Sequence, residues 1–124
     1  MKAVLPTKIP ALRTIAMPAD ANPDGDIFGG WIMAQMDVAS GNFAAQTVKG
    51  RVATVAVDAM TFYKPVYVGD DVSCYCEISK IGNTSITIHV DVWVHRHHSE
   101  VILKVTQGSF TFVAIDGSGN ARKI

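Results

Sequence analysis

One stretch of the chain, residues 30–48, constrains the fold more than any other. Its sequence is GWIMAQMDVASGNFAAQTV, and its apolar side chains occupy nearly every side of a helix. The Pro-, Asp- and Gly-rich residues 18–27 predict a loop before it, and Gly50 is suited to ending it. A helix that is apolar all round is buried. Asp37 nevertheless stands in its middle, and this ionisable acid is the first candidate for a functional group.

Strand patterns follow the helix. Residues 52–62 are apolar on both alternating sets, which predicts a strand buried on both faces. Residues 71–80 and 84–95 each alternate between an apolar and a polar face, and residues 100–115 predict a long last strand with Gly108 as a bend or bulge. A short strand is also predicted within 11–17, after a poorly structured arm over 1–10. The order predicts an α+β fold in which one sheet packs on the buried helix.

Composition limits the possible functions. A chain of 124 residues predicts a single domain over residues 1–124. A formal net charge of zero gives no basic surface for nucleic acid, and it favours association into an oligomer. No apolar run approaches the roughly 20 residues of a membrane span. Cys74 and Cys76 share one face of a strand and predict buried, reduced thiols. With no signal-peptide core at the start, they favour the cytoplasm.

Three segments carry a family resemblance over about residues 11–117. They are DANPDGDIFGGWIMAQMDVASG (20–41), RVATVAVDAMTFYKPVYVGDDV (51–72) and GSFTFVAID (108–116). Together they resemble the hotdog-fold acyl-CoA thioesterases of the YciA type. The resemblance implies a curved antiparallel sheet wrapped around one long buried helix, and hydrolysis of acyl-CoA to a carboxylic acid and CoA. It also implies a homo-oligomer, a trimer of dimers with active sites at each dimer interface.

The resemblance also implies site residues. Asn22 matches the family's Asn in the loop before the helix, Gly29-Gly30 matches its glycine pair, and Asp37 matches its helix acid. In such enzymes the Asn of one subunit faces the acid of the other. The expected substrate-binding residues are Phe28, Trp31, Arg51, Thr61, Lys64, Gly82 and Ser85.

Physical chemistry supports the same positions. A helix N-terminus offers unpaired N–H groups and a positive dipole end, so the backbone at Gly29 to Trp31 is a candidate oxyanion hole. Glycines there let a thioester carbonyl approach without meeting a Cβ. Asp37 lies seven residues beyond Gly30, about 10 Å along the helix and on nearly the same side. It can act as general base or as nucleophile, and the sequence does not choose between these roles.

Structural alternatives exist for each of these residues. Asp37 can be a buried structural acid paired with Arg51 or Lys64, and Gly29-Gly30 can be simply a tight entry to the helix. Asn22 before Pro23 is typical of a turn.

Two other functions are possible for a chain with this fold. A hotdog dehydratase is disfavoured because it uses a histidine with an acid, and residues 30–48 contain no histidine. A non-catalytic acyl-CoA sensor on the same fold remains as the alternative, which turnover would separate from an enzyme.

The remaining motifs have simpler interpretations. His95, His97 and His98 are close together, but no acid or cysteine converges on them in sequence, so a solvated turn is favoured over a metal site. No metal and no cofactor is expected beyond the CoA of the substrate. Candidate partners for its phosphates are Arg51, Lys64, Lys80 and Arg96, and the turn at 80–85 offers backbone donors. The methionines Met17, Met33, Met36 and Met60 are expected to fill the core, or to line an acyl slot.

Overall fold

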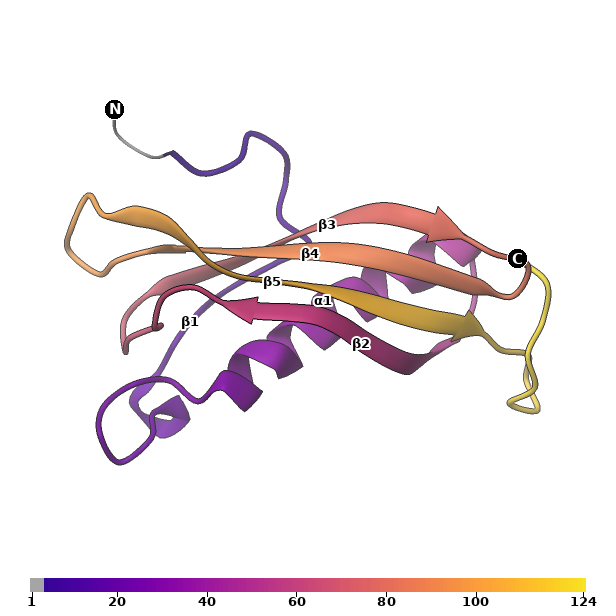
Figure 1. Ribbon diagram of the computed structural model, residues 1–124, viewed down its shortest axis with the longest axis horizontal. Coiled ribbons are helices and arrows are strands. Elements are labelled where there is room, and N and C mark those ends of the chain that lie inside the picture. Colours follow the sequence, from indigo (N-terminus) through magenta and orange to yellow (C-terminus); the bar gives the residue numbers. More distant parts are fainter. Residues whose placement is uncertain (1–3) are drawn as a thin grey trace.

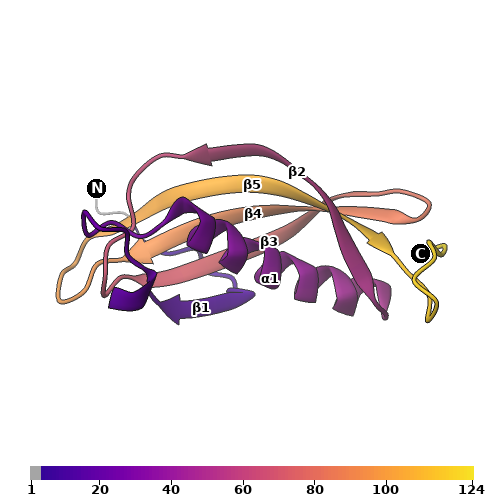
Figure 2. The same cartoon turned by 90° about the horizontal axis from the view of Figure 1, so that it is seen from below.

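A curved antiparallel sheet wraps one side of a long helix in the computed structural model, which describes residues 4–124 (Figures 1 and 2). The elements are β1 (Leu12–Ile15), the 3-10 helix η1 (Pro18–Asp20), α1 (Gly29–Val48), β2 (Val52–Phe62), β3 (Asp71–Ile81), β4 (Ser85–His95) and β5 (Ile102–Ala114). The strand order in the sheet is β1-β3-β4-β5-β2. The predicted α+β hotdog arrangement is confirmed, and the predicted boundaries of α1, β3, β4 and β5 agree with the observed ones to within two residues.

The core lies between α1 and the concave face of the sheet. Every second residue of β4 from Ile86 to Val94 is fully buried against the helix, while the residues between them are half-buried. Phe110 and Phe112 of β5 extend this face, and Met36 of α1 packs on it. The alternation that predicted β4 is therefore the alternation of its burial. In β3 the predicted alternation is wrong, because Ser73 and Tyr75 of the polar set are buried and Ile78 of the apolar set is exposed.

Gly108 plays a different part from the predicted one. It stays in register with Val90 of β4, and the irregularity lies opposite it in β2, between Asp58 and Thr61. A Cβ at Gly108 would sit 3.0 Å from Met60 Cε and 3.4 Å from Met36 Cε. The missing side chain thus makes room for two methionines. By contrast, Met17 is 55 % exposed, so its predicted place in the core is wrong.

Two burial predictions are wrong for the single chain. β2 was expected to be buried on both faces, but it is the last strand of the sheet, and Val55 is 57 % exposed. α1 was expected to be buried all round, but the sheet covers only one side of it, and Val38 is 59 % exposed. The apolar surface that α1 and β2 leave exposed is larger than is usual for a monomer. Exposed apolar surfaces of this kind mark interaction sites.

The end of α1 is built around an arginine from the C-terminal tail. Lys49, rather than Gly50, takes the left-handed conformation that ends the helix, with φ 57°. The Arg122 guanidinium donates to the Val48 carbonyl at 2.8 Å, where a cation also complements the helix dipole. A Cβ at Gly50 would lie 2.5 Å from this guanidinium, so a side chain at this position would require the arginine to shift.

Both cysteines of β3 are free and buried, as predicted. Burial raises the pKa of the Cys74 thiol to about 12 and that of the Cys76 thiol to about 11, so neither is a nucleophile at neutral pH. Over residues 4–124 no helix has the length and apolar character that crossing a bilayer requires.

The concave face predicts a clear asymmetry between neighbouring substitutions in β4. Ile88→Ala removes a fully buried side chain and is expected to lower the free energy of unfolding by about 2–5 kcal/mol. Thr87→Ala, on the half-exposed convex face, is expected to lower it by less than about 1 kcal/mol. Urea denaturation measures both, and similar losses for the two variants would contradict this placement of the core.

Candidate active site

An open groove of about 310 Å³ lies between α1 and β2. Its lining residues are Gly30, Met33, Ala34 and Asp37 of α1, Thr54 and Val57 of β2, and Phe110 of β5. The α1 members are spaced three, one and three residues apart, which places them along one side of the helix. Gly30 and Asp37 therefore share one groove, as their spacing in the sequence predicts. Apart from these two, the lining is almost entirely apolar.

Within the described residues, one side-chain hydrogen bond reaches the Asp37 carboxylate. The Thr54 hydroxyl donates to Asp37 Oδ1 at 2.8 Å, and the side chain is half-buried. Within residues 4–124, Asp37 forms no ion pair, so neither Arg51 nor Lys64 pairs with it as the structural alternative required. One carboxylate oxygen is thus fixed by a neutral donor, and the other can take up a proton or attack a carbonyl carbon.

The helix start supplies backbone donors at the other end of this groove, about 10 Å along α1 from the acid. In the described chain, the N–H groups of Gly29 and Gly30 donate to no protein acceptor. The Trp31 N–H, which was predicted to join them, instead donates to the Phe28 carbonyl at 3.1 Å. No atom lies within 4 Å of the position of a Cβ at Gly30, so the approach to this glycine is open.

Asn22 organises the segment that leads into the helix, which we call the Asn22 loop (residues 22–28). Its side-chain Oδ1 accepts from the backbone N–H groups of Asp24 at 2.9 Å and Asp26 at 3.1 Å. The turn predicted from Asn22-Pro23 is therefore confirmed. Because the amide oxygen is committed to the loop, only the side-chain NH₂ group of Asn22 remains for any other partner.

The other residues proposed for substrate binding lie outside this groove in the single chain. Phe28 is exposed just before α1, Trp31 packs against the core, and Thr61 and Lys64 are exposed at and just beyond the end of β2. A second group lies toward the opposite end of α1, about 30 Å from its start (Figure 1). This group consists of Arg51, Gly82 and Ser85, near β-ladder partners in the last residues of β5.

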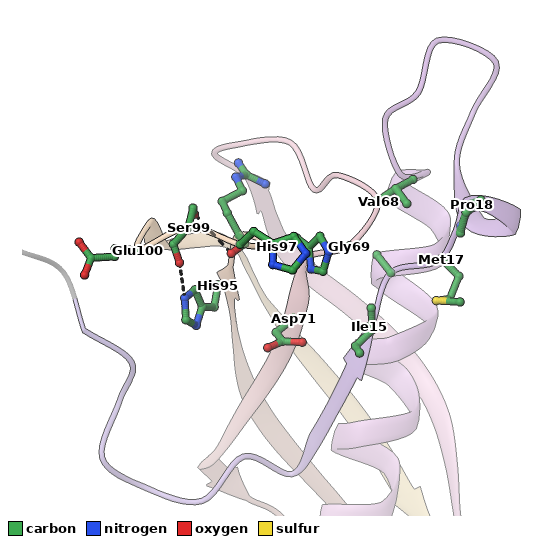
Figure 3. Close-up of a pocket in the computed structure, with 13 residues that line it drawn as sticks. Ile15, Met17, Pro18, Val68, Gly69, Asp71, His95, His97, Ser99 and Glu100 are labelled. Carbon is green, nitrogen blue, oxygen red and sulfur yellow. Dashed lines mark hydrogen bonds between the residues drawn. The ribbon is translucent and has the colours of Figure 1, made fainter.

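A larger cavity, of about 640 Å³, contains none of the predicted catalytic and substrate-binding residues, although Arg96, a candidate partner for CoA phosphate, lies in its wall. It lies between β1, the segment before β3 and the hairpin that joins β4 to β5 (Figure 3). Its walls include all three hairpin histidines, and His97 and His98 are exposed in a turn, as predicted. In the described part of the chain, no three His, Cys, Asp or Glu side chains converge to hold a metal ion. We place the candidate active site in the smaller groove, because the acid and the open helix end are there.

Sequence reasoning missed Thr54 and misjudged Arg96. Thr54 was hidden in the apolar run of residues 52–57, where one hydroxyl among Val and Ala was the available signal. Arg96 was a candidate for binding phosphate, but its guanidinium is engaged with the Asp70 carboxylate and with the Pro65 carbonyl. Thr54 is distant in sequence from Asp37, and Arg96 is distant from Asp70 and Pro65. Only the fold shows that these residues are in contact.

Comparison with known proteins supplies the remaining observations. The Thioesterase superfamily model matches residues 24–100. The acyl-CoA thioester hydrolase YciA of Escherichia coli (strain K12) is 48% identical over 116 residues, which cover 91% of this chain and 88% of the relative. A hexameric thioesterase from Yersinia pestis superimposes with a TM-score of 0.91 at 50% identity, covering 97% of this chain and 98% of that one. A hexameric broad specificity acyl-coenzyme A thioesterase does so with a TM-score of 0.89 at 48% identity, covering 98% and 84%.

The Asn22 loop leads to a test that needs no activity. Asn22→Ala removes the acceptor of two backbone N–H groups, so amide hydrogen exchange at Asp24 and Asp26 is expected to rise about fivefold or more, since a lost bond is worth about 1 kcal/mol or more. Asn22→Asp keeps an acceptor oxygen and is expected to preserve protection. Equal exchange in the two variants would show that the side-chain oxygen does not hold the loop.

Proposed function

Because this chain belongs to the thioesterase superfamily, we propose that it hydrolyses acyl-CoA thioesters to a free carboxylic acid and coenzyme A. The observation that carries this proposal is the groove in which Asp37 and the open helix start at Gly30 lie together. A thioester needs an activated nucleophile, a stabiliser for the developing oxyanion and an apolar slot for the acyl chain. Asp37, the N–H groups of Gly29 and Gly30, and the apolar walls of the groove supply the three.

The proposed chemistry follows from these positions. The thioester oxygen accepts from the free N–H groups at the start of α1, which stabilise the negative charge that develops on it. Asp37 takes a proton from water as the water oxygen bonds to the carbonyl carbon. The carbon–sulfur bond then breaks, and CoA leaves as a thiolate that takes up a proton. In the alternative route, Asp37 attacks the carbon itself, CoA leaves, and water hydrolyses the resulting anhydride.

Thr54 restricts both routes to one geometry. Its hydroxyl fixes Asp37 Oδ1, so Oδ2 is the oxygen left to act on water or on the thioester carbon. A residue that locks the rotamer of a catalytic acid helps to keep it in a productive position. Phe110, which is fully buried, forms the base of the groove beneath the acyl chain.

We propose that the working unit is a homo-oligomer in which Asn22 of one subunit serves Asp37 of another. Three observations support this proposal. Asn22 does not line its own chain's groove, its side-chain NH₂ group has no partner among residues 4–124, and apolar residues of α1 and β2 are exposed beside the groove. The similar structures from Yersinia pestis and of the broad specificity enzyme are hexameric, which favours a trimer of such dimers.

The individual residues that contact CoA are also part of this proposal. Phe28 and Trp31 flank the helix start, Thr61 and Lys64 lie at the end of β2 nearest to it, and Lys64 is an exposed cation for a CoA phosphate. Arg51, Gly82 and Ser85 would contribute only if a neighbouring subunit brought that end of the fold to the groove. The two buried free thiols favour work in the reducing cytoplasm.

Removing the acid tests the proposal directly. Asp37→Asn keeps the size of the side chain and removes its basicity, so thiol release from a panel of acyl-CoA esters is expected to fall at least a hundredfold. Asp58→Asn, an exposed acid on the same strand as Thr54, serves as the control and is expected to keep near wild-type rates. Wild-type protein that binds acyl-CoA but releases no thiol would support the sensor alternative. Full activity in Asp37→Asn would make Asp37 structural.

Sharing of the site between subunits is tested by mixing two impaired variants. Asp37→Asn and Asn22→Ala are each expected to keep only a small residual activity, but co-expressed chains form mixed dimers in which one of two sites carries both native residues. A random twofold-symmetric mixture then regains about a quarter of wild-type activity. Measured thiol release at the level of the separate variants would show that each site uses one chain only.

A further inference from the structure

Resting on the proposed function, we infer that Arg96 is a positioning residue that holds the Asn22 loop in place from the hairpin between β4 and β5. From the sequence, Arg96 was only a candidate partner for a CoA phosphate, and the HRHH stretch that contains it was interpreted as a solvated turn. The structure gives Arg96 contacts with a connector, residues 65–70, which lies between that hairpin and the Asn22 loop. All three segments meet at the end of the fold where α1 begins (Figures 1 and 2).

Arg96 contacts the connector at three points. Its Nη1 donates to Asp70 Oδ2, its Nη2 donates to the Pro65 carbonyl at 3.1 Å, and its guanidinium stacks over the Tyr67 ring at 4.4 Å. The Asp70 side chain is 2 % exposed, and its Oδ2 also accepts from the Tyr67 N–H at 2.9 Å. Buried charges are retained where they are paired and hydrogen-bonded. The planar fork of arginine makes these contacts simultaneously, which a lysine cannot do.

The hairpin packs closely on the connector at a second position. Gly69 has φ 92°, and a Cβ there would lie 2.9 Å from His97 Cβ. Figure 3 shows Gly69 and His97 side by side at the wall of the larger cavity. The Gly69 N–H also donates to the Ala16 carbonyl at 2.8 Å, which ties the connector to the end of β1. The connector is thus fixed to the sheet from two sides.

The connector in turn carries the Asn22 loop. The Ile27 N–H donates to the Val66 carbonyl at 2.9 Å, and Asp26 forms a β-bridge with Tyr67. Within the loop, the Asn22 N–H donates to the Asp26 carbonyl at 2.6 Å, and the Asp26 N–H donates to Asn22 Oδ1. Arg96 therefore acts on Asn22 through two residues, Tyr67 and Asp26. If the Asn22 amide is displaced, the reaction rate falls even though every catalytic group is still present.

The test compares Arg96→Lys with Arg122→Lys. Arg96→Lys keeps a cation beside Asp70 and removes the fork, so kcat is expected to fall about 10–100-fold, with KM little changed. Amide exchange at residues 24–27 is expected to rise while that of β4 is unchanged. Arg122→Lys alters an arginine at the opposite end of α1, and it is expected to leave both kcat and exchange in the loop at wild-type values.

A double-variant cycle separates positioning from a merely structural role. On the Asn22→Ala background, Arg96→Lys is expected to change kcat by less than about twofold, because its effect passes through the missing side chain. Equal losses on both backgrounds, or unchanged exchange at residues 24–27, would overturn the inference. If the wild type releases no thiol, the proposed function fails, and the exchange measurement alone decides the role of Arg96. If Arg96→Lys does not fold, the charge-free pair Asp70→Asn/Arg96→Gln takes its place in the same measurements.

Discussion

The packing of α1 on the concave face of the sheet is the contact on which the rest of the structure depends. The side of the helix that carries Met36 and Ala39 completes the core, while the side that carries Gly30 and Asp37 forms a wall of the groove. Both sides belong to one rigid helix, which sets the distance between the acid and the helix start. The core packing then fixes where this helix, with both groups, lies against the sheet. Under the proposed function, the same element is structural on one side and chemical on the other, which accounts for an ionisable group in so apolar a segment.

Much of this arrangement is present in local patterns of the sequence. The alternation in residues 84–95 and the apolar run around Asp37 specify element type and the inward face, and the spacing of Gly30 and Asp37 places them on one side of the helix. Contacts between distant segments are not specified by such local patterns. Thr54 beside Asp37, and Arg96 beside Asp70, are separated by 17 and 26 residues, and no local pattern links the members of either pair.

The errors in predicted burial have one physical origin. Apolar composition records every surface that a chain hides from water, including surfaces that other subunits cover. The patterns of β2 and α1 therefore predict complete burial, while the single chain leaves Val55 and Val38 exposed. The misplacement of the bulge has another origin, since a glycine in a strand signals close packing as readily as a break in the ladder.

The space above Gly108 has a consequence for how the sequence can change over time. Met36 and Met60 approach Gly108 from two different elements, and a side chain at position 108 would meet both. An allowed replacement at any of the three positions then depends on which residues occupy the other two. Positions 36, 60 and 108 should therefore vary as a unit among descendants of this chain, with a larger residue at 108 appearing only where a methionine has already been shortened.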